Sequence, residues 1–231
     1  LRSRLAIDWV IKQCGNIEPQ RVKPSIWNLL RIGAYELMYA PKTAEHGIIN
    51  DAADLVRHRG GQRTVGFVNA ILRAIQKNIL ERQAPLFQSP PQNILPHNET
   101  CGCLFRKAIL PAPDGDPVNY FSIAFSLPTW LVAEWLDVYG FDTTRQICQA
   151  GNRHPSVIAQ PNTLCTTAEQ LADRLAEEGI QCELDPEKTM LRLLHGGHLT
   201  KIQAFLDGYF IIQDPTAAEA MQQAAPSPGW T

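Results

Sequence analysis

Five basic side chains in the first third of the chain have the residue types and spacing of a phosphate contact. They are Arg57, Arg59, Arg63, Arg73 and Lys77. The first three surround the pair Gly60-Gly61, and the last two stand one helical turn apart. Cations on a helical surface attract phosphate groups, and arginine can add two parallel hydrogen bonds. The pattern therefore indicates an anion-binding face, and its alternative is an ordinary solvated surface.

The stretch GFVNAILRAI, residues 66–75, predicts a helix that carries part of this face. Its apolar members recur at helical spacing and need a core; they are Phe67, Val68, Ile71, Leu72 and Ile75. Asn69 stands four positions before Arg73. It either continues the basic stripe or satisfies backbone groups inside a helical bundle.

Charge is distributed unevenly, although the net formal charge is only −2. Residues 1–83 contain 13 Lys and Arg against 7 Asp and Glu, a balance of +6. Residues 84–231 contain 8 against 16, a balance of −8, so the two parts sum to −2. A basic front segment suggests an anionic partner for that segment alone. Chance asymmetry is the alternative.

The sequence gives no indication of a membrane span or a metal site. No apolar run approaches the roughly 18 residues of a span, and the first residues lack the pattern of a signal peptide. The six cysteines have no Cys-x-x-Cys spacing, which predicts free thiols in a reducing cytoplasm. His97, Cys101 and Cys103 form a poor zinc set, because Cys-x-Cys is unfavourable chelate spacing and no second pair follows. We expect no metal.

Residues 1–83 have the pattern of a helical bundle, with short connections and no strand signal. Four helices are expected: one ending at residues 14–16, one from Pro24 to about Ala40, one capped by Thr43 and ended by Gly60-Gly61, and one from about Thr64 to Leu80. Gly33 and Ala34 in the second helix would let another helix approach closely.

The remainder divides into a proline-rich segment and a region of changed periodicity. Seven prolines lie between Pro85 and Pro117, so residues 84–127 are expected to form a linker or insertion. Pro128 opens a helix that Ser126 would cap, and a short helix follows at Thr143. The order β-α-β-β-α-β then predicts a small split βαβ sandwich within residues 128–225.

These segments together resemble a known family. The stretches LLRIGAYELMYAP, HGIINDAADLVRHRG and GFVNAILRAI resemble NusB-like RNA-binding domains. The stretches LPTWLVAEWLDVYG, AGNRHPSVIAQPNTL and GYFIIQDPTAAEAM resemble the connecting region of the Sun/RsmB-type 16S rRNA cytosine-C5 methyltransferases. In that family, a NusB-like domain precedes a catalytic module that uses S-adenosylmethionine. The resemblance spans the chain except for about residues 84–120.

The resemblance implies four parts. Residues 1–83 would be a mainly α, NusB-like bundle that lacks its first helix, and 84–127 a linker or insertion. Residues 128–225 would be a helical plus α+β, ferredoxin-like connecting domain, and 226–231 the start of an absent catalytic domain. The chain is thus expected to be a fragment, and Arg57, Arg59, Arg63, Arg73 and Lys77 would bind 16S rRNA.

Three departures from the family pattern limit what this chain could do. It stops before the family's glycine-rich cofactor loop, and none of its cysteines stands in the family's Pro-Cys or Thr-Cys-Ser setting. Cys165, in LCTT, is expected to be a buried structural thiol. Gln160 stands where arginine is common in the family, which puts any role of that arginine in doubt.

By resemblance, the parent reaction is methyl transfer to carbon 5 of cytosine, which a cysteine thiolate activates by adding to carbon 6. Only Gln213 and Asp214, at the end of the last expected strand, could approach a cofactor pocket. The alternative for Asp214 is to cap the following helix, with Pro215 in its first turn.

Two other functions fit parts of the sequence. One is a non-enzymatic NusB-like transcription antitermination factor that binds RNA and a ribosomal protein; residues 128–225 argue against it, because such a factor has no use for them. The other is a helical protein-interaction module that does not touch RNA. An rRNA-recognition fragment accounts for more of the chain than either.

Residues 1–231 alone are expected neither to bind S-adenosylmethionine appreciably nor to transfer a methyl group, because the glycine-rich loop and functional cysteines are missing. Isothermal titration calorimetry with this chain checks the prediction. A micromolar complex with the cofactor would contradict it.

Overall fold

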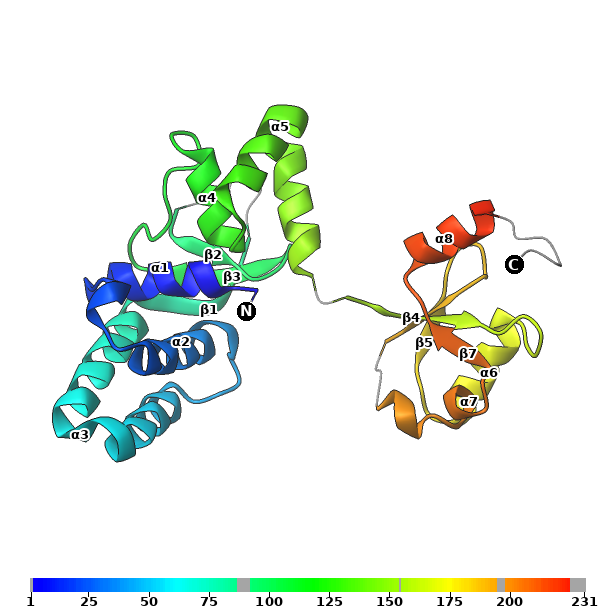
Figure 1. Cartoon of the computed structure of the whole chain (residues 1–231), viewed down its shortest axis with the longest axis horizontal. Helices are drawn as coiled ribbons and strands as arrows, with labels where there is room; N and C mark the ends of the chain where they lie inside the picture. The colour runs from blue at the N-terminus through cyan, green and yellow to red at the C-terminus, as the bar shows by residue number, and fades with distance from the viewer. Residues whose placement is uncertain (1, 87–91, 154, 195–197, 225–231) are drawn as a thin grey trace. The chain divides into compact units, whose positions relative to one another are not determined.

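The structure, a computed structural model, describes residues 2–86, 92–153, 155–194 and 198–224, apart from the side chains of 58–60 and 222. The chain forms two compact units, Leu1–Arg153 and His154–Thr231 (Figure 1). In the described part, no helix is long and apolar enough to cross a membrane.

Three helices build the first part of the first unit, as the apolar periodicity predicts. They are α1 (Arg4–Gly15), α2 (Pro24–Tyr39) and α3 (Glu45–Asn78), with a short 3-10 turn, η1 (Pro19–Arg21), before α2. The expected third and fourth helices are the two halves of α3, because Gly61 interrupts it with φ 68° and ψ 172°. Residue 44 rather than Thr43 precedes α3, and no side chain caps it.

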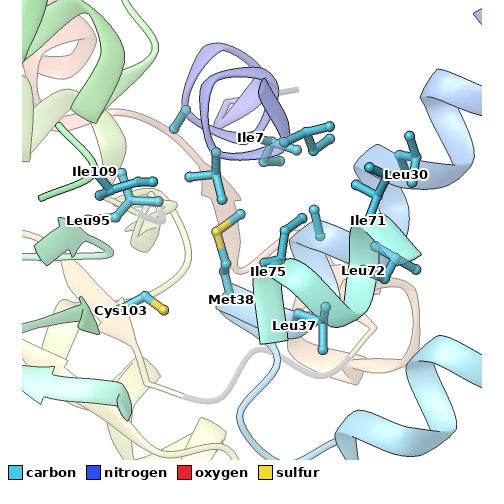
Figure 2. Packing of buried hydrophobic residues seen from close by; sticks show 14 of the residues in the cluster. Ile7, Leu30, Leu37, Met38, Ile71, Leu72, Ile75, Leu95, Cys103 and Ile109 are labelled. Atoms are coloured by element: carbon cyan, nitrogen blue, oxygen red, sulfur yellow. The ribbon is translucent and has the colours of Figure 1, made fainter. Parts of the chain in front are cut away.

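The core of this bundle depends on two glycines. A Cβ on Gly33 of α2 would lie 2.8 Å from Leu72 Cδ1, and a Cβ on Gly15 would lie 2.8 Å from Ile71 Cδ1. The close approach expected at Gly33 is therefore confirmed, and its partner is α3. Leu72 is fully buried. Figure 2 shows Ile75 of α3 beside Met38 of α2, in the same apolar cluster.

The proline-rich segment is more structured than the expected linker. It contains most of a three-stranded antiparallel sheet of order β1-β3-β2, formed by β1 (Ile79–Pro85), β2 (Ile94–Pro96) and β3 (Cys101–Phe105). Leu95, Cys103 and Phe105 are fully buried in the cluster that also holds the bundle core. These strands are short and depend on pairing between distant residues, so local sequence signals did not reveal them. α3 ends at Asn78, two residues before the expected end of the fourth helix, and β1 begins at Ile79.

Two further helices complete the first unit. They are α4 (Pro117–Phe125) and α5 (Thr129–Asn152), which is interrupted at Gly140 with φ 72°. Ser126 does not cap α5; it ends α4 in the left-handed conformation, and its Oγ accepts a hydrogen bond from the Ala6 amide at 3.1 Å. The boundary between the compact units therefore follows α5, whereas the sequence placed this helix with the α+β region.

The second unit has the expected α+β fold. Its elements are β4 (Val157–Pro161), α6 (Ala168–Glu177), β5 (Cys182–Leu184), β6 (Leu191–Leu193), η2 (Leu199–Lys201), α7 (Gln203–Leu206), β7 (Phe210–Ile212) and α8 (Pro215–Ala224). The antiparallel sheet has the order β5-β6-β4-β7, which is the ferredoxin-like arrangement. Thr167 caps α6 in a reciprocal capping box with Gln170. The expected second helix is only the short α7 after the η2 turn.

His97 follows β2 and packs on α2 in the first unit. Its ring centroid lies 4.4 Å from that of Tyr39. Its Nε2 is buried and has no hydrogen-bond partner among the described residues. Burial therefore lowers the pKa of His97 to about 4, because a protonated ring would lose its solvation.

The tight contact at Gly33 leads to a prediction with an internal control. Gly33→Ala should destabilise the protein by about 1 kcal/mol, because overpacking against Leu72 outweighs the gain in helix propensity. Gly66→Ala should stabilise it by roughly 0.5–1 kcal/mol, because a Cβ there meets nothing within 4 Å. Urea unfolding measures both. If both changes stabilised the protein equally, the close contact between position 33 and Leu72 would not restrict the side chain at position 33.

The buried imidazole predicts a loss of stability in acid. The unfolded chain takes up a proton on His97 near pH 6.5, but the folded protein does so only near pH 4. The contribution is therefore complete above pH 6.5 and is lost as the pH falls toward 4. When the pH falls from 7 to 4.5, the unfolding free energy of wild type should decrease by roughly 2 kcal/mol more than that of His97→Phe. An identical pH dependence in both proteins would contradict this.

Candidate nucleic-acid interface

A cationic cavity lies where α2 begins, opposite the second half of α3. Its volume is about 560 Å³. It is lined by Arg21, Val22, Lys23, Ser25, Ile26, Leu29, Arg63, Thr64 and Phe67. Among the described residues, the lining combines three cations, two hydroxyl groups and an apolar wall, and none of these lining residues is acidic. Such a site attracts an anion and also offers apolar surface to the group attached to it.

The start of α2 brings two of these cations to the cavity. The η1 turn ends at Arg21, and Val22 and Lys23 are extended before Pro24 opens the helix. The carbonyl oxygen of Lys23 accepts hydrogen bonds from the Ile26 and Trp27 amides at 2.9 and 3.0 Å. The first turn of α2 therefore borders the cavity with the positive end of the helix dipole.

The interruption at Gly61 brings the third cation. Its φ of 68° lies in a region that side chains disfavour, so glycine allows α3 to change direction here. The second half of α3 then places Arg63, Thr64 and Phe67 on the cavity. Arg63 is exposed, and Phe67 is half-buried. Residues that are distant in sequence are thereby joined in one cationic site.

The other basic residues selected from the sequence lie elsewhere on α3. Arg57 is paired with Asp54 at 2.8 Å, and both side chains are 60% exposed. The side chain of Arg59 lies outside the described residues. Arg73 and Lys77 are exposed one turn apart, as expected, and do not line the cavity. Of the four basic residues whose side chains are described, Arg63 alone lines the cavity.

Sequence analysis missed three cations that lie close to these positions. Arg21 and Lys23 stand just before Pro24 in QRVKPS, and a basic pair directly before a helix start was the available signal. Arg106 follows β3, and its Nε donates to the Lys77 carbonyl oxygen at 2.8 Å. No local signal links Arg106 to α3, because the sheet brings them together.

Asn69 is less exposed than Arg73 and Lys77. Its side chain is partly buried, and its Oδ1 has no hydrogen-bond partner in the part of the chain that the structure describes. The alternative of satisfying backbone groups through that oxygen is likewise not observed there.

Gln213 and Asp214 follow β7, and each forms a hydrogen bond within the second unit. The backbone N–H of Gln213 donates to the Ile158 carbonyl oxygen at 3.1 Å. Asp214 Oδ1 accepts from the Thr216 amide at 2.9 Å, in the first turn of α8. This geometry favours the capping alternative for Asp214.

The cysteines are free; Cys103 and Cys148 are buried, and Cys14 is partly buried. Burial raises the pKa of Cys14 and Cys148 to about 11 and that of Cys103 to about 12. At neutral pH these thiols stay protonated. The expectation for Cys165 was wrong: it is exposed, in the turn that follows β4. Among the described residues, no group of three or more His, Cys, Asp or Glu side chains could hold a metal ion.

Comparison with known proteins matches the two parts of the chain to different families. Residues 1–77 match the NusB family. Residues 127–197 match the family described as Methyltr_RsmF/B-like, ferredoxin-like domain. The chain thus combines a NusB domain with an RsmF/B-like ferredoxin-like domain, in agreement with the fold and with the resemblance seen in the sequence.

Some relatives match nearly the whole chain, and another matches about a third of it. The probable ribosomal RNA small subunit methyltransferase B of Bacillus subtilis is 28% identical over 99% of this chain and 47% of its own length. The protein of that name from Synechocystis is 24% identical over 99% and 45%. The transcription antitermination protein NusB of Sorangium cellulosum is 32% identical over 32% of this chain and 54% of its own length.

A solved structure has the same fold. The crystal structure of PH0851 has a TM-score of 0.63 and 19% identity, over 99% of this chain and 45% of that one. The chain spans about half the length of the methyltransferase relatives that it matches.

Proposed function

We propose that this chain, which joins a NusB domain to an RsmF/B-like ferredoxin-like domain, is the RNA-holding part of an rRNA methyltransferase. The parent protein would use S-adenosylmethionine to methylate carbon 5 of a cytosine in 16S rRNA. The observation that carries the RNA-holding role is the cavity lined by Arg21, Lys23 and Arg63.

The chemistry of the cavity supports a nucleic-acid ligand. Its cations can neutralise backbone phosphates, and arginine can grip a phosphate with two hydrogen bonds. Ile26, Leu29 and Phe67 give the same cavity apolar surface on which a base or ribose can pack. Arg73 and Lys77 lie further along α3, with Arg106 bonded to the Lys77 backbone, so they could continue the track.

The methyl-transfer step is proposed for the parent protein, and no residue described here is given a catalytic role. S-Adenosylmethionine would supply the methyl group, and a cysteine thiolate would activate carbon 6 of the base. Cys14, Cys103 and Cys148 do not suit that task, because burial raises the pKa of each thiol.

The match to the RsmF/B-like domain disfavours a free-standing antitermination factor. The Sorangium NusB protein matches only 75 residues, whereas residues 127–197 belong to a domain of a different family. Contact with a ribosomal protein remains compatible with the methyltransferase proposal.

Charge removal at the cavity tests the RNA proposal. Arg21→Ala with Arg63→Ala should weaken binding of a labelled 16S rRNA hairpin and flatten the salt dependence. Each lost phosphate contact should reduce the log–log slope by roughly 0.7–0.9. The effect is measured by fluorescence anisotropy across a salt series, with circular dichroism to confirm the fold.

Two further double variants make the test specific. Arg73→Ala with Lys77→Ala asks whether the track extends along α3, and should also reduce affinity and slope. Lys188→Ala with Arg192→Ala removes the same charge from the second unit and should change little. Equal effects from all three would indicate net charge alone. Wild-type affinity and slope in both front-half variants would refute the proposed RNA site.

A further inference from the structure

The first half of α5, the helix labelled in Figure 1, exposes a stripe that combines apolar and acidic side chains. Its members are Trp130, Ala133, Glu134, Asp137 and Val138. They recur at positions i, i+3, i+4, i+7 and i+8, so they share one face of the helix. Gly140 then interrupts α5, so the stripe is confined to the residues before it.

The opposite face of the same helix packs on the core. Val132 is fully buried, and Trp135 and Leu136 are partly buried against the same apolar cluster. The helix is therefore already anchored without the stripe. Yet Trp130 is 67% exposed and Val138 61% exposed. A tryptophan on the solvent side of an amphipathic helix does not contribute to this core, but it suits an interface, where tryptophan is enriched among the energetically dominant residues.

The negative charge of the stripe indicates which kind of ligand could bind there. Glu134 and Asp137 are exposed, and neither forms an ion pair within the described part of the chain. The stripe itself contains no basic residue. It would repel the phosphates of RNA, and it would attract lysine or arginine. An arginine can also stack on the exposed Trp130 ring.

We propose that this α5 stripe is a docking surface for an arginine-bearing, amphipathic segment of another protein. An apolar side chain of the partner packs on Trp130 and Val138, while its cations pair with Glu134 and Asp137. The surface lies beyond residues 1–77, which match the NusB family, and it is separate from the cationic cavity. The proposal does not depend on RNA binding.

A pair of defined peptides tests this surface in the full chain. One is a short helical peptide of leucine, alanine and arginine, with its arginines one turn apart; the other has glutamate at each arginine position. Fluorescence anisotropy should show that wild-type protein binds the arginine peptide and not the glutamate peptide. Trp130→Ala should weaken binding about tenfold or more, which is the effect of losing one dominant interface residue.

Charge reversal distinguishes this surface from general acidity. Glu134→Arg with Asp137→Arg should abolish binding of the arginine peptide and create binding of the glutamate peptide. Asp173→Arg with Glu177→Arg changes the net charge equally on α6, where both residues are exposed, and should leave the arginine peptide bound. Absence of wild-type binding, or equal losses in the two reversals, would overturn the proposal.

Two other occupants give distinct results. If Trp130→Ala weakens binding of the 16S rRNA hairpin instead, the stripe is an RNA contact. If wild-type protein self-associates in analytical ultracentrifugation and Trp130→Ala is monomeric, the occupant is a second copy of the chain. Either result would overturn the proposal of a basic protein partner.

Discussion

The close approach of α1, α2 and α3 is the constraint on which the first unit depends. Ile71 and Leu72 are adjacent on α3, and they fill the space left by Gly15 and Gly33. Since interiors are close-packed, this contact fixes α3 against both other helices. The cationic cavity lies between the start of α2 and the same half of α3, so its geometry follows from this packing. The apolar packing thus determines where Arg21, Lys23 and Arg63 lie, although these three residues are not part of the core.

Polar contacts also connect the elements of the first unit. Asp8 of α1 accepts hydrogen bonds from Trp27 Nε1 at 2.8 Å and from Arg31 Nε at 2.6 Å. Arg82 of β1 donates to the Thr43 carbonyl oxygen at 2.7 Å, which holds the sheet to the α2–α3 connection. These two arginines are thereby committed to the fold. By contrast, Arg21 and Arg63, which belong to the proposed RNA site, form no ion pair in the described part of the chain.

The two proposed surfaces divide the first unit by charge. The cavity collects cations from η1, α2 and α3, while the first half of α5 presents Glu134 and Asp137 without an ion-pair partner among the described residues. This separation refines the contrast between a basic front segment and an acidic remainder. Because like charges would repel the wrong ligand at each surface, RNA and a basic protein segment could bind without competing.

The sequence by itself determined the features that local signals encode. The apolar period identified the bundle helices, and the pair Gly60-Gly61 marked the break in α3. The order of strands and helices was enough to recognise the ferredoxin-like unit. Only tertiary structure decided that β1, β2 and β3 pair into a sheet, that Cys165 is exposed, and that Arg63 lines one cavity with Arg21 and Lys23. Those outcomes depend on contacts between residues far apart in the chain, and periodicity carries no information about which distant segments will meet.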